Sequence, residues 1–576
     1  MLSQTIIQIF DNFTYLCHLY ETPFQSSMRR LSTIFDRKRV KHFDTLANLY
    51  EYSTTLYSNN KLSQVVDGEL FYTYGSFKEK CDLLSNKLSR YGIGAGDKVA
   101  ILAHNTPNWT VAFFACVSFS RIAVPILIDS SENEVTNILQ HSESKVIFIS
   151  KRLLYKLSQD SLSGMRLVLD IDTFETIKAD DDAFTCDGRV AVPKPNDIAA
   201  IIYTSGTTGS AKGVVLSHRN LTSNIISAYH SYRCTERDRW LSVLPMAHTY
   251  ELTVGVLYPI YCGATVYYMS KPPVPALLLA AMKKIRPTAL LVVPLIVEKI
   301  YRNSVLPTIC KSKTLSWMNK HQNTLMCIII GLKLKKTFGG KIGILVGGAK
   351  LDPKVEEFFY KARFRYGIGY GLTETSPLIC AAFGRHRYPG SIGIPARGVE
   401  VRLDNVNQET GEGEIVVKGD NVMLGYYKDP ERTKDAFTED GWFRTNDIAS
   451  VDKKGRYYIR GRLGNMIVGP SGENIYPEEI ESVINNIEGV NESIIVERKG
   501  KLVALIQFNE NIIDWDCEGE AEFYEKLETI KTMVMSIVNK KVNKISKINA
   551  VEVMKEPFDK TATEKIRRFK YEEEQK

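Results

Sequence analysis

The chain has 576 residues, more than one hydrophobic core usually serves, so we expect two or more domains or subdomains. Its 44% hydrophobic and 24% charged residues are ordinary for a soluble globular protein. The formal net charge of +8 is small for this length and excludes the concentrated positive field of a nucleic-acid binder.

The cysteines and the apolar runs indicate the compartment. Ten cysteines are scattered from Cys17 to Cys517 without a C-x-x-C pair, so a reducing compartment is the simpler interpretation. The N-terminus has no basic start, and Asp11 and Asn12 interrupt its apolar run, which argues against a signal peptide. The longest apolar runs fall well below the roughly 20 residues that span a bilayer. We therefore expect a cytoplasmic protein without a transmembrane helix.

Alternating strands and helices dominate the first half of the chain. From Lys98 the sequence reads KVAIL, the helix-like NWTVAFFACVSFSR, AVPIL, a helical segment around NEVTNILQHSE, and KVIFIS. This order predicts right-handed βαβ units on a parallel sheet. The same alternation returns from Ala199, in AAIIYTS, LTSNIISAYHSY, RWLSVLP and GATVYYM, which predicts a second α/β layer.

The texture changes after about Pro389 and again after Gly464. Short glycine-rich strands such as VEVRLD and GEGEIVVKG indicate a β-rich subdomain over about 389–463. Beyond it, PEEIESVINNI, SIIVER, LVALIQF and a long amphipathic segment predict a small α+β domain. We thus predict an α/β protein with an N-terminal extension at 1–44, a large N-terminal domain at 45–463 and a small mobile C-terminal domain at 464–576.

The loop at 203–213, YTSGTTGSAKG, is suited to phosphate. It follows the apolar strand AAII and combines glycines, which allow close backbone approach, with hydroxyl groups and the positive Lys212. Its spacing differs from a Walker A loop, because Gly213 stands where that motif has Ser or Thr. A solvent-exposed Ser/Thr/Gly turn is the alternative interpretation of such a run.

The full string YTSGTTGSAKGVVLSHRN resembles the signature of the adenylate-forming superfamily, which includes acyl-CoA synthetases, luciferases and peptide-synthetase adenylation domains. The likeness extends from roughly residue 45 to the C-terminus, and LPMAHTYELTVG, VGGAKLDP, YGIGYGLTETSP and GWFRTNDIASVD follow in the family's order. The resemblance implies that ATP, Mg²⁺ and coenzyme A are used. It implies that ATP is bound by Ser205, Gly206, Thr207, Thr208, Gly209, Lys212, Gly348, Ala349, Tyr370, Gly371, Thr373, Asp447 and Arg462.

The same resemblance implies individual roles. Thr204 and Glu374 would bind Mg²⁺, and His248 would lie beside the acyl pocket. Tyr370 would stack on adenine, since an aromatic face suits a purine, and Thr373 would contact phosphate. Asp447 and Arg462 would contact the ribose. The sequence departs from the family's usual T-G-D at Asn446, which replaces the glycine.

The C-terminal string PFDKTATEKIRRFK resembles the family's terminal motif, in which a lysine reaches the active site. That lysine is Lys565, and Glu564 stands where the family usually has glycine. Gly464 stands where the family usually has a hinge aspartate or lysine, and glycine also permits a large backbone rotation. The resemblance implies that Lys565 serves adenylation and is withdrawn by rotation about Gly464 before coenzyme A reacts.

AHTYELTVGVLYPIYCGATVYY and GGAKLDPKVEEFFYKARF resemble the long-chain fatty acyl-CoA synthetase branch. We therefore expect an AMP-forming acid–thiol ligase that converts a long-chain fatty acid to acyl-AMP and then to a coenzyme A thioester. Transfer to an acyl carrier protein is one alternative. A non-catalytic nucleotide- or lipid-binding relative is the other, against which the intact site residues argue.

The segment 299–341 is basic and apolar and contains no Asp or Glu. Its cations are Lys299, Arg302, Lys311, Lys313, Lys320, Lys333, Lys335, Lys336 and Lys341. It also contains Trp317 and LMCIIIGL. Such a stretch suits peripheral contact with an anionic membrane, and a buried helix with a solvated basic edge is the equal alternative.

Overall fold

The computed structural model describes residues 40–180, 190–205, 211–269, 273–321, 323–468, 474–498, 500–509, 512–513, 520–561 and 566–572. The chain divides into two compact units, Met1–Phe43 and Asp44–Lys576. All helices and strands named below belong to the second unit. The domain boundaries expected at 44 and 464 stay predictions.

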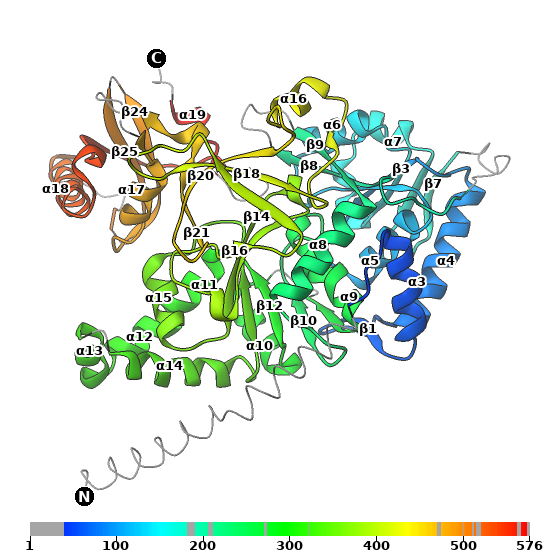
Figure 1. The fold of residues 1–576 in the computed structure, drawn as a ribbon, viewed down its shortest axis with the longest axis horizontal. Helices are drawn as coiled ribbons and strands as arrows, with labels where there is room; N and C mark the ends of the chain where they lie inside the picture. Colours follow the sequence, from blue (N-terminus) through cyan, green and yellow to red (C-terminus); the bar gives the residue numbers. More distant parts are fainter. Residues whose placement is uncertain are drawn as a thin grey trace, which may run out of the picture. The chain divides into compact units, whose positions relative to one another are not determined.

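The first sheet has the strand order β19-β9-β8-β4-β3-β5-β6-β7. Its strands β9, β8, β3 and β7 are labelled in Figure 1. Its strands are β3 (Lys98–Leu102), β4 (Ile122–Pro125), β5 (Val146–Ile149), β6 (Leu167–Asp170), β7 (Thr176–Ala179), β8 (Ile198–Ser205), β9 (Ala211–Ser217) and β19 (Gly425–Tyr426). Strands β3 to β6 pair in parallel, and β8 joins β4 in parallel, as the alternation predicts. Strand β9 returns antiparallel along β8, so the two ends of the phosphate-type segment 203–213 lie side by side.

Strands β3 to β6 are buried along almost their whole length and need cover on both faces, and helices precede, connect or follow them along the chain. These helices are α3 (Leu46–Leu56), α4 (Tyr74–Arg90), α5 (Pro107–Val117), α6 (Glu132–Ser142) and α7 (Gln159–Gly164). Helix α6 begins with a capping box, in which the Ser131 hydroxyl accepts from the Glu134 backbone and the Glu134 carboxylate accepts from the Ser131 backbone.

The second sheet has the order β16-β15-β14-β13-β12-β10-β11-β1-β2. Its strands are β1 (Lys61–Val65), β2 (Phe71–Thr73), β10 (Arg239–Ser242), β11 (Thr265–Tyr268), β12 (Ala289–Val292), β13 (Gly343–Val346), β14 (Tyr366–Gly371), β15 (Leu378–Ala382) and β16 (Ile394–Pro395). Neighbouring strands from β11 through β10, β12 and β13 to β14 are parallel. Their carboxyl ends therefore share one edge, the usual place for a ligand in such sheets.

The helices of this half are α8 (His218–Ser231), α9 (Tyr258–Cys262), α10 (Pro275–Ile285), α11 (Pro294–Ile300), α12 (Leu306–Cys310), α13 (Lys313–Lys320), α14 (Thr324–Thr337) and α15 (Pro353–Lys361). Buried side chains of α14 and α15, such as Ile330 and Phe358, share a core with Leu290 and Ile344 of the sheet. This second α/β layer confirms the fold class expected from the repeated alternation.

A separate antiparallel sheet, β17-β18-β20-β21, lies within the predicted β-rich region. Its strands are β17 (Val399–Asp404), β18 (Gly413–Gly419), β20 (Phe443–Val451) and β21 (Tyr457–Arg462), and α16 (Pro430–Asp435) precedes β20. Asp447 on β20 stands directly opposite Arg462 on β21. The register of this sheet therefore brings two predicted site residues together.

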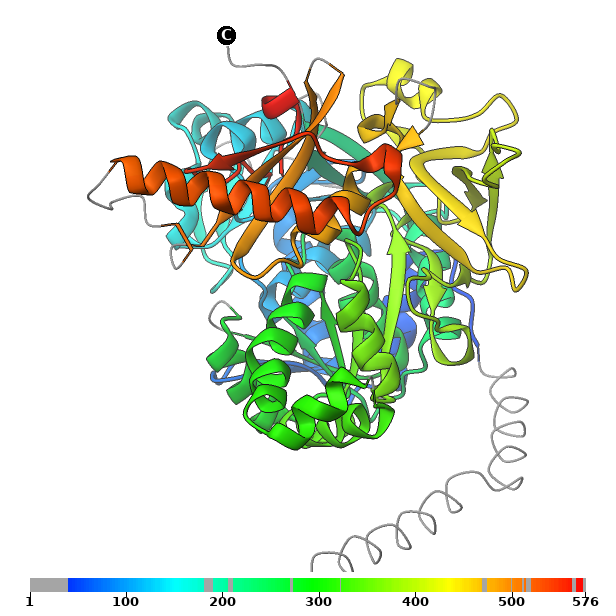
Figure 2. The same cartoon turned by 90° about the vertical axis from the view of Figure 1, so that its left-hand side faces the viewer.

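The C-terminal elements have their own hydrophobic core. They are β22 (Ile467–Val468), β23 (Asn474–Ile475), α17 (Pro477–Ile484), β24 (Val490–Arg498), β25 (Lys501–Phe508), α18 (Glu520–Asn539), β26 (Ala550–Met554) and α19 (Phe569–Glu572). Strands β24, β25 and β26 form a sheet, and α18 lies across it (Figure 2). Ile480, Ile495 and Val534 fill the space between the sheet, α17 and α18.

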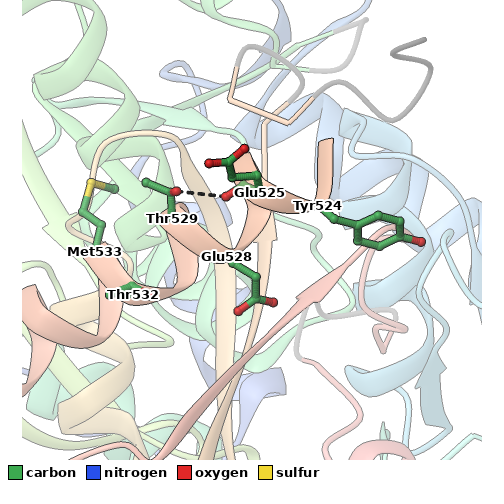
Figure 3. Close-up of a pocket in the computed structure, with 6 residues that line it drawn as sticks. All are labelled: Tyr524, Glu525, Glu528, Thr529, Thr532 and Met533. Carbon is green, nitrogen blue, oxygen red and sulfur yellow. Dashed lines mark hydrogen bonds between the residues drawn. The ribbon is translucent and has the colours of Figure 1, made fainter. Parts of the chain in front are cut away.

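An open hollow runs along the outer side of α18. Its lining residues are Tyr524, Glu525, Glu528, Thr529, Thr532 and Met533, all from this one helix (Figure 3). The Thr529 hydroxyl donates to the Glu525 carbonyl at 2.9 Å, so it is used within the helix. None of these residues belongs to the predicted site.

Candidate active site

Thr204 and Lys212 are paired residues of β8 and β9, close to the segment that connects the two strands. Ser205 is the last residue of β8. The Thr204 Oγ1 atom is buried and has no hydrogen-bond partner in the described part of the chain. A buried hydroxyl without a partner is costly unless a ligand satisfies it. This strand pair thus presents one unsatisfied hydroxyl and one cation at the start of the phosphate-type loop.

Glu374 comes from the other sheet and meets Lys212. It lies in the short 3-10 helix Thr373–Thr375, just after the carboxyl end of β14. Lys212 Nζ donates to Glu374 Oε1 at 2.7 Å, although the two residues are 162 positions apart in the chain. The interaction joins the β8–β9 strand pair of the first sheet to the carboxyl edge of the second.

Glu374 is only 7% exposed, and yet its carboxyl is held in the charged form. Burial raises the pKa of this carboxyl, but the Lys212 ammonium and hydrogen bonds from Lys212 and Tyr426 lower it further than burial raises it. The net pKa is below the ordinary value. An ionised carboxylate is the form that binds a hard divalent cation.

Three further residues form a second polar cluster. Asp447 is 5% exposed, and its Oδ1 accepts from Arg462 Nε at 3.0 Å. Its Oδ2 accepts from the Tyr370 hydroxyl at 2.7 Å. Tyr370 lies in β14, near the end that leads to Glu374. A single chain segment therefore connects the two clusters.

The backbone conformation at Asn446 accounts for an asparagine where the family's T-G-D has glycine. Its φ is 58°, in the left-handed region where glycine is preferred and asparagine is the most tolerated other residue. The backbone conformation is therefore compatible with this asparagine, and Asp447 keeps its contacts.

The other predicted residues of the main body lie around the same edge. Gly348 and Ala349 follow β13, and Gly371 ends β14. A Cβ on Gly371 would lie 1.8 Å from the Pro377 carbonyl oxygen, so only glycine fits there. Thr373 is buried, and its Oγ1 accepts from Thr249 Oγ1 at 3.3 Å.

His248 follows β10 and precedes the π-helix Glu251–Leu257. Its Nδ1 accepts from the Tyr250 backbone at 3.2 Å, which fixes the ring relative to the start of the helix. Thr249, the next residue, makes the contact with Thr373 described above. The structure therefore brings His248 to the same edge as Thr373.

Some predicted positions lie outside the described residues. These are Gly206, Thr207, Thr208, Gly209 and Lys565. Gly464 is described and lies in the 3-10 helix Leu463–Asn465. A Cβ there would meet nothing within 4 Å, so this conformation does not itself require glycine. The hinge at Gly464 stays a prediction.

The donor set fits a magnesium ion that arrives with a nucleotide. Glu374 offers a charged carboxylate and Thr204 an unsatisfied hydroxyl, and Mg²⁺ commonly takes its other ligands from phosphate and water. In the ranges described above, no group of three or more His, Cys, Asp or Glu side chains could hold a metal ion.

The structure adds three hydrogen bonds that the sequence did not suggest. Tyr426 on β19 accepts from Lys212 Nζ at 2.9 Å and donates to Glu374 Oε1 at 3.0 Å. The Tyr370 ring was expected to stack on adenine, and its hydroxyl also donates to Asp447. None of the three follows from local spacing, because each joins segments at least 52 residues apart in the sequence.

Comparisons with known proteins agree with this geometry. Residues 57–427 match the AMP-binding enzyme family. Long chain acyl-CoA synthetase 6, peroxisomal, from Arabidopsis thaliana is 30% identical over 497 residues, covering 78% of this chain and 70% of that protein. Long chain acyl-CoA synthetase 1 from the same plant is 30% identical over 574 residues, covering 87% and 85%.

Solved structures agree on the fold. ATP-bound MatB from Rhodopseudomonas palustris has a TM-score of 0.73 at 23% identity, covering 91% of this chain and 98% of that one. MenE from Bacillus subtilis with its acyl-adenylate OSB-AMP has a TM-score of 0.73 at 22% identity, covering 92% and 98%. From its sequence match and the two polar clusters, this chain belongs to the AMP-binding enzyme family, a family of ligases.

Proposed function

We propose that this protein uses ATP to activate a long-chain fatty acid as acyl-AMP and then transfers the acyl group to coenzyme A. The observation that most strongly supports this proposal is the hydrogen bond between Lys212 and Glu374, next to the unsatisfied Thr204 hydroxyl. These groups suit the phosphates and metal of ATP, and the Tyr370, Asp447 and Arg462 cluster suits its nucleoside.

In the first step a carboxylate oxygen of the acid attacks the α-phosphorus, and pyrophosphate leaves. Both reactants are anions, so the residues around them must offset charge. Lys212 and the loop that precedes it offset the charge of the pyrophosphate leaving group. Lys565 offsets the charge of the acyl carboxylate and the α-phosphate. Glu374 and Thr204 would hold Mg²⁺, which would supply further positive charge next to the phosphates when bound.

In the second step the thiol sulfur of coenzyme A attacks the acyl carbon, AMP leaves and the thiol proton goes to solvent. This step needs no pyrophosphate site. Rotation of the C-terminal domain about Gly464 would withdraw Lys565 and admit the thiol. Acyl-AMP is easily hydrolysed, so keeping it enclosed between the steps preserves the activated acid.

The acid is proposed from the relatives. The two Arabidopsis proteins are named long chain acyl-CoA synthetases and align with most of this chain. The decisive experiment is acid-dependent pyrophosphate release over fatty acids of graded chain length, each with and without coenzyme A. We expect the highest kcat/KM with long chains and thioester only with coenzyme A.

Other outcomes of that assay favour the alternatives. If pyrophosphate is released but no thioester forms with coenzyme A, and acyl carrier protein then supports thioester formation, the carrier protein is the acceptor. Absence of acid-dependent pyrophosphate release with every acid would indicate a non-catalytic relative. A preference for short or aromatic acids would keep adenylation and reject the long-chain assignment.

We also propose that the exposed face of α13 and α14 contacts an anionic membrane from which the acid is drawn. Trp317, Ile329 and Leu332 are 60%, 48% and 51% exposed, and Lys333 and Lys336 are exposed beside them. The four α14 residues, Ile329, Leu332, Lys333 and Lys336, follow the i, i+3, i+4 and i+7 spacing of one helix face. No helix of the described chain is long and apolar enough to cross a membrane.

Lys335 provides a matched control because it faces the protein. Its Nζ donates to the Arg363 carbonyl at 3.2 Å and lies 5.6 Å from the Phe364 ring centroid. We expect Lys333→Glu with Lys336→Glu to lower the affinity for anionic vesicles, measured by co-sedimentation, by about thirtyfold, at about 1 kcal/mol per lysine. Lys335→Gln should change vesicle binding little. Equal binding by the double variant and the unmodified protein would reject the membrane contact.

A further inference from the structure

Lys212, Glu374 and Tyr426 form a closed triangle of hydrogen bonds. The three sides join Lys212 Nζ to Glu374 Oε1 (2.7 Å), Lys212 Nζ to the Tyr426 hydroxyl (2.9 Å), and that hydroxyl to Glu374 Oε1 (3.0 Å). Lys212 Nζ also lies 4.5 Å from the centroid of the Tyr426 ring. Tyr426 therefore contacts both charged groups, by its hydroxyl and by its ring.

The backbone around Tyr426 is tied to both partners. Tyr426 pairs with Val214 on β9, two residues after Lys212. The Met423 backbone donates to the Glu374 carbonyl at 2.8 Å. The segment 423–427 thus connects the strand that carries Lys212 to the turn that carries Glu374.

Thr433 fixes the start of this short strand. Its Oγ1 accepts from the Tyr426 backbone at 2.9 Å. Gly425 has a φ of 145°, and a Cβ there would lie 2.7 Å from Thr433 Cγ2. Glycine at 425 therefore allows Thr433 to reach the backbone and to hold Tyr426 in place.

We infer that Tyr426 is a positioning residue that orients Glu374 toward the metal bound to the phosphates of ATP. Its hydroxyl has one proton, which it donates to Glu374, and it accepts from Lys212. When Lys212 turns to phosphate, the bond to Tyr426 still restricts the carboxylate. This inference rests on the proposed function, because it needs Mg²⁺ and ATP at this site.

A purely structural role predicts something different. If Tyr426 only stabilised the fold, its loss would weaken every ligand-binding step alike. If it orients Glu374, its loss weakens the part of ATP binding that depends on Mg²⁺. Conversion of supplied acyl-AMP and coenzyme A to thioester involves no pyrophosphate and should be spared.

The test is calorimetric ATP binding to the full chain, in excess Mg²⁺ and in EDTA, for the unmodified protein and Tyr426→Phe. Phenylalanine keeps the ring over Lys212 and removes the hydroxyl. We expect the Kd for ATP with Mg²⁺ to rise about tenfold, as for loss of a hydrogen bond to a charged group, and the Kd in EDTA to stay the same. Equal losses in both conditions, or no loss, would overturn the inference.

Tyr427→Phe is the matched control. The Tyr427 hydroxyl lies 3.5 Å from Glu143 Oε2, on the other side of the strand, so its loss should leave both Kd values unchanged. Thr433→Val is the second variant, used if Tyr426→Phe does not fold. It removes the acceptor of the Tyr426 backbone and should produce a smaller loss with the same Mg²⁺ dependence; equal loss without Mg²⁺ would also reject the inference.

Different measurements would reject the proposed function and the role of Tyr426. Absence of acid-dependent pyrophosphate release from the unmodified protein would reject the function itself. Normal release by the unmodified protein, together with Mg²⁺-dependent ATP binding that Tyr426→Phe does not weaken, would reject only the role of Tyr426.

Discussion

The polar clusters at the sheet edges and the polar contacts of the C-terminal segment 566–572 are built differently. The first join strands of different sheets through buried carboxylates, Glu374 at 7% exposure and Asp447 at 5%. In the second, Arg568 pairs with the buried Glu481 of α17, within the C-terminal elements. The described contact of Arg567 with α6 is a single ion pair to Glu134 at 3.3 Å, with side chains 25% and 34% exposed.

The difference indicates how the two parts serve the reaction. If these clusters bind ATP, Lys212 must turn from Glu374 to phosphate, while Glu374 and Asp447 stay held by their hydrogen bonds to Tyr426, Tyr370 and Arg462. A partly exposed ion pair contributes little free energy and is easily broken. This arrangement suits a preformed binding site and a lysine that is delivered and withdrawn with the C-terminal segment.

Lys565→Ala should have the largest effect. If Lys565 stabilises charge in the adenylation step, its removal should lower the rate of acid-dependent pyrophosphate release by about 10²–10³-fold. The same variant should convert supplied acyl-AMP and coenzyme A to thioester at the unmodified rate. Single-turnover measurement of the two half-reactions checks this, and equal loss of both would refute delivery by a mobile segment.

The sequence was sufficient to predict the two α/β layers and most residues of the two polar clusters, and the reasons can be stated. Apolar strands alternating with helices predicted both parallel sheets, and the family motifs predicted Thr204, Lys212, Glu374 and Asp447. Tyr426 could not be predicted, because its importance arises from the pairing of β19 with β9, about 210 residues apart in the chain. Motif spacing encodes local geometry, whereas such pairings depend on the assembled sheet.

Asp447→Asn should have an intermediate effect and should separate the two clusters. The change removes the charge that pairs with Arg462 and one acceptor of the Tyr370 and Arg462 hydrogen bonds. At about 1.5–3 kcal/mol for a charged hydrogen bond, the Kd for ATP should rise about 10- to 100-fold. Because this cluster serves the nucleoside, AMP binding should weaken equally and without dependence on Mg²⁺. Isothermal titration with ATP and AMP measures both; unchanged AMP binding would reject the assignment of Asp447 to the nucleoside.

Arg567→Gln should have the smallest effect, because it breaks a partly exposed ion pair of about 0.2–1 kcal/mol. Glutamine loses the charge that pairs with Glu134 but leaves Glu134 as the cap of α6. If the pair forms only in the adenylating arrangement, adenylation should slow by about two- to fivefold and thioester formation from supplied acyl-AMP should remain unchanged. Lys570→Gln is the control, because Lys570 pairs with Asp559 inside the C-terminal elements. If Arg567→Gln slows both half-reactions equally, the contact stabilises the fold and does not favour one arrangement over the other.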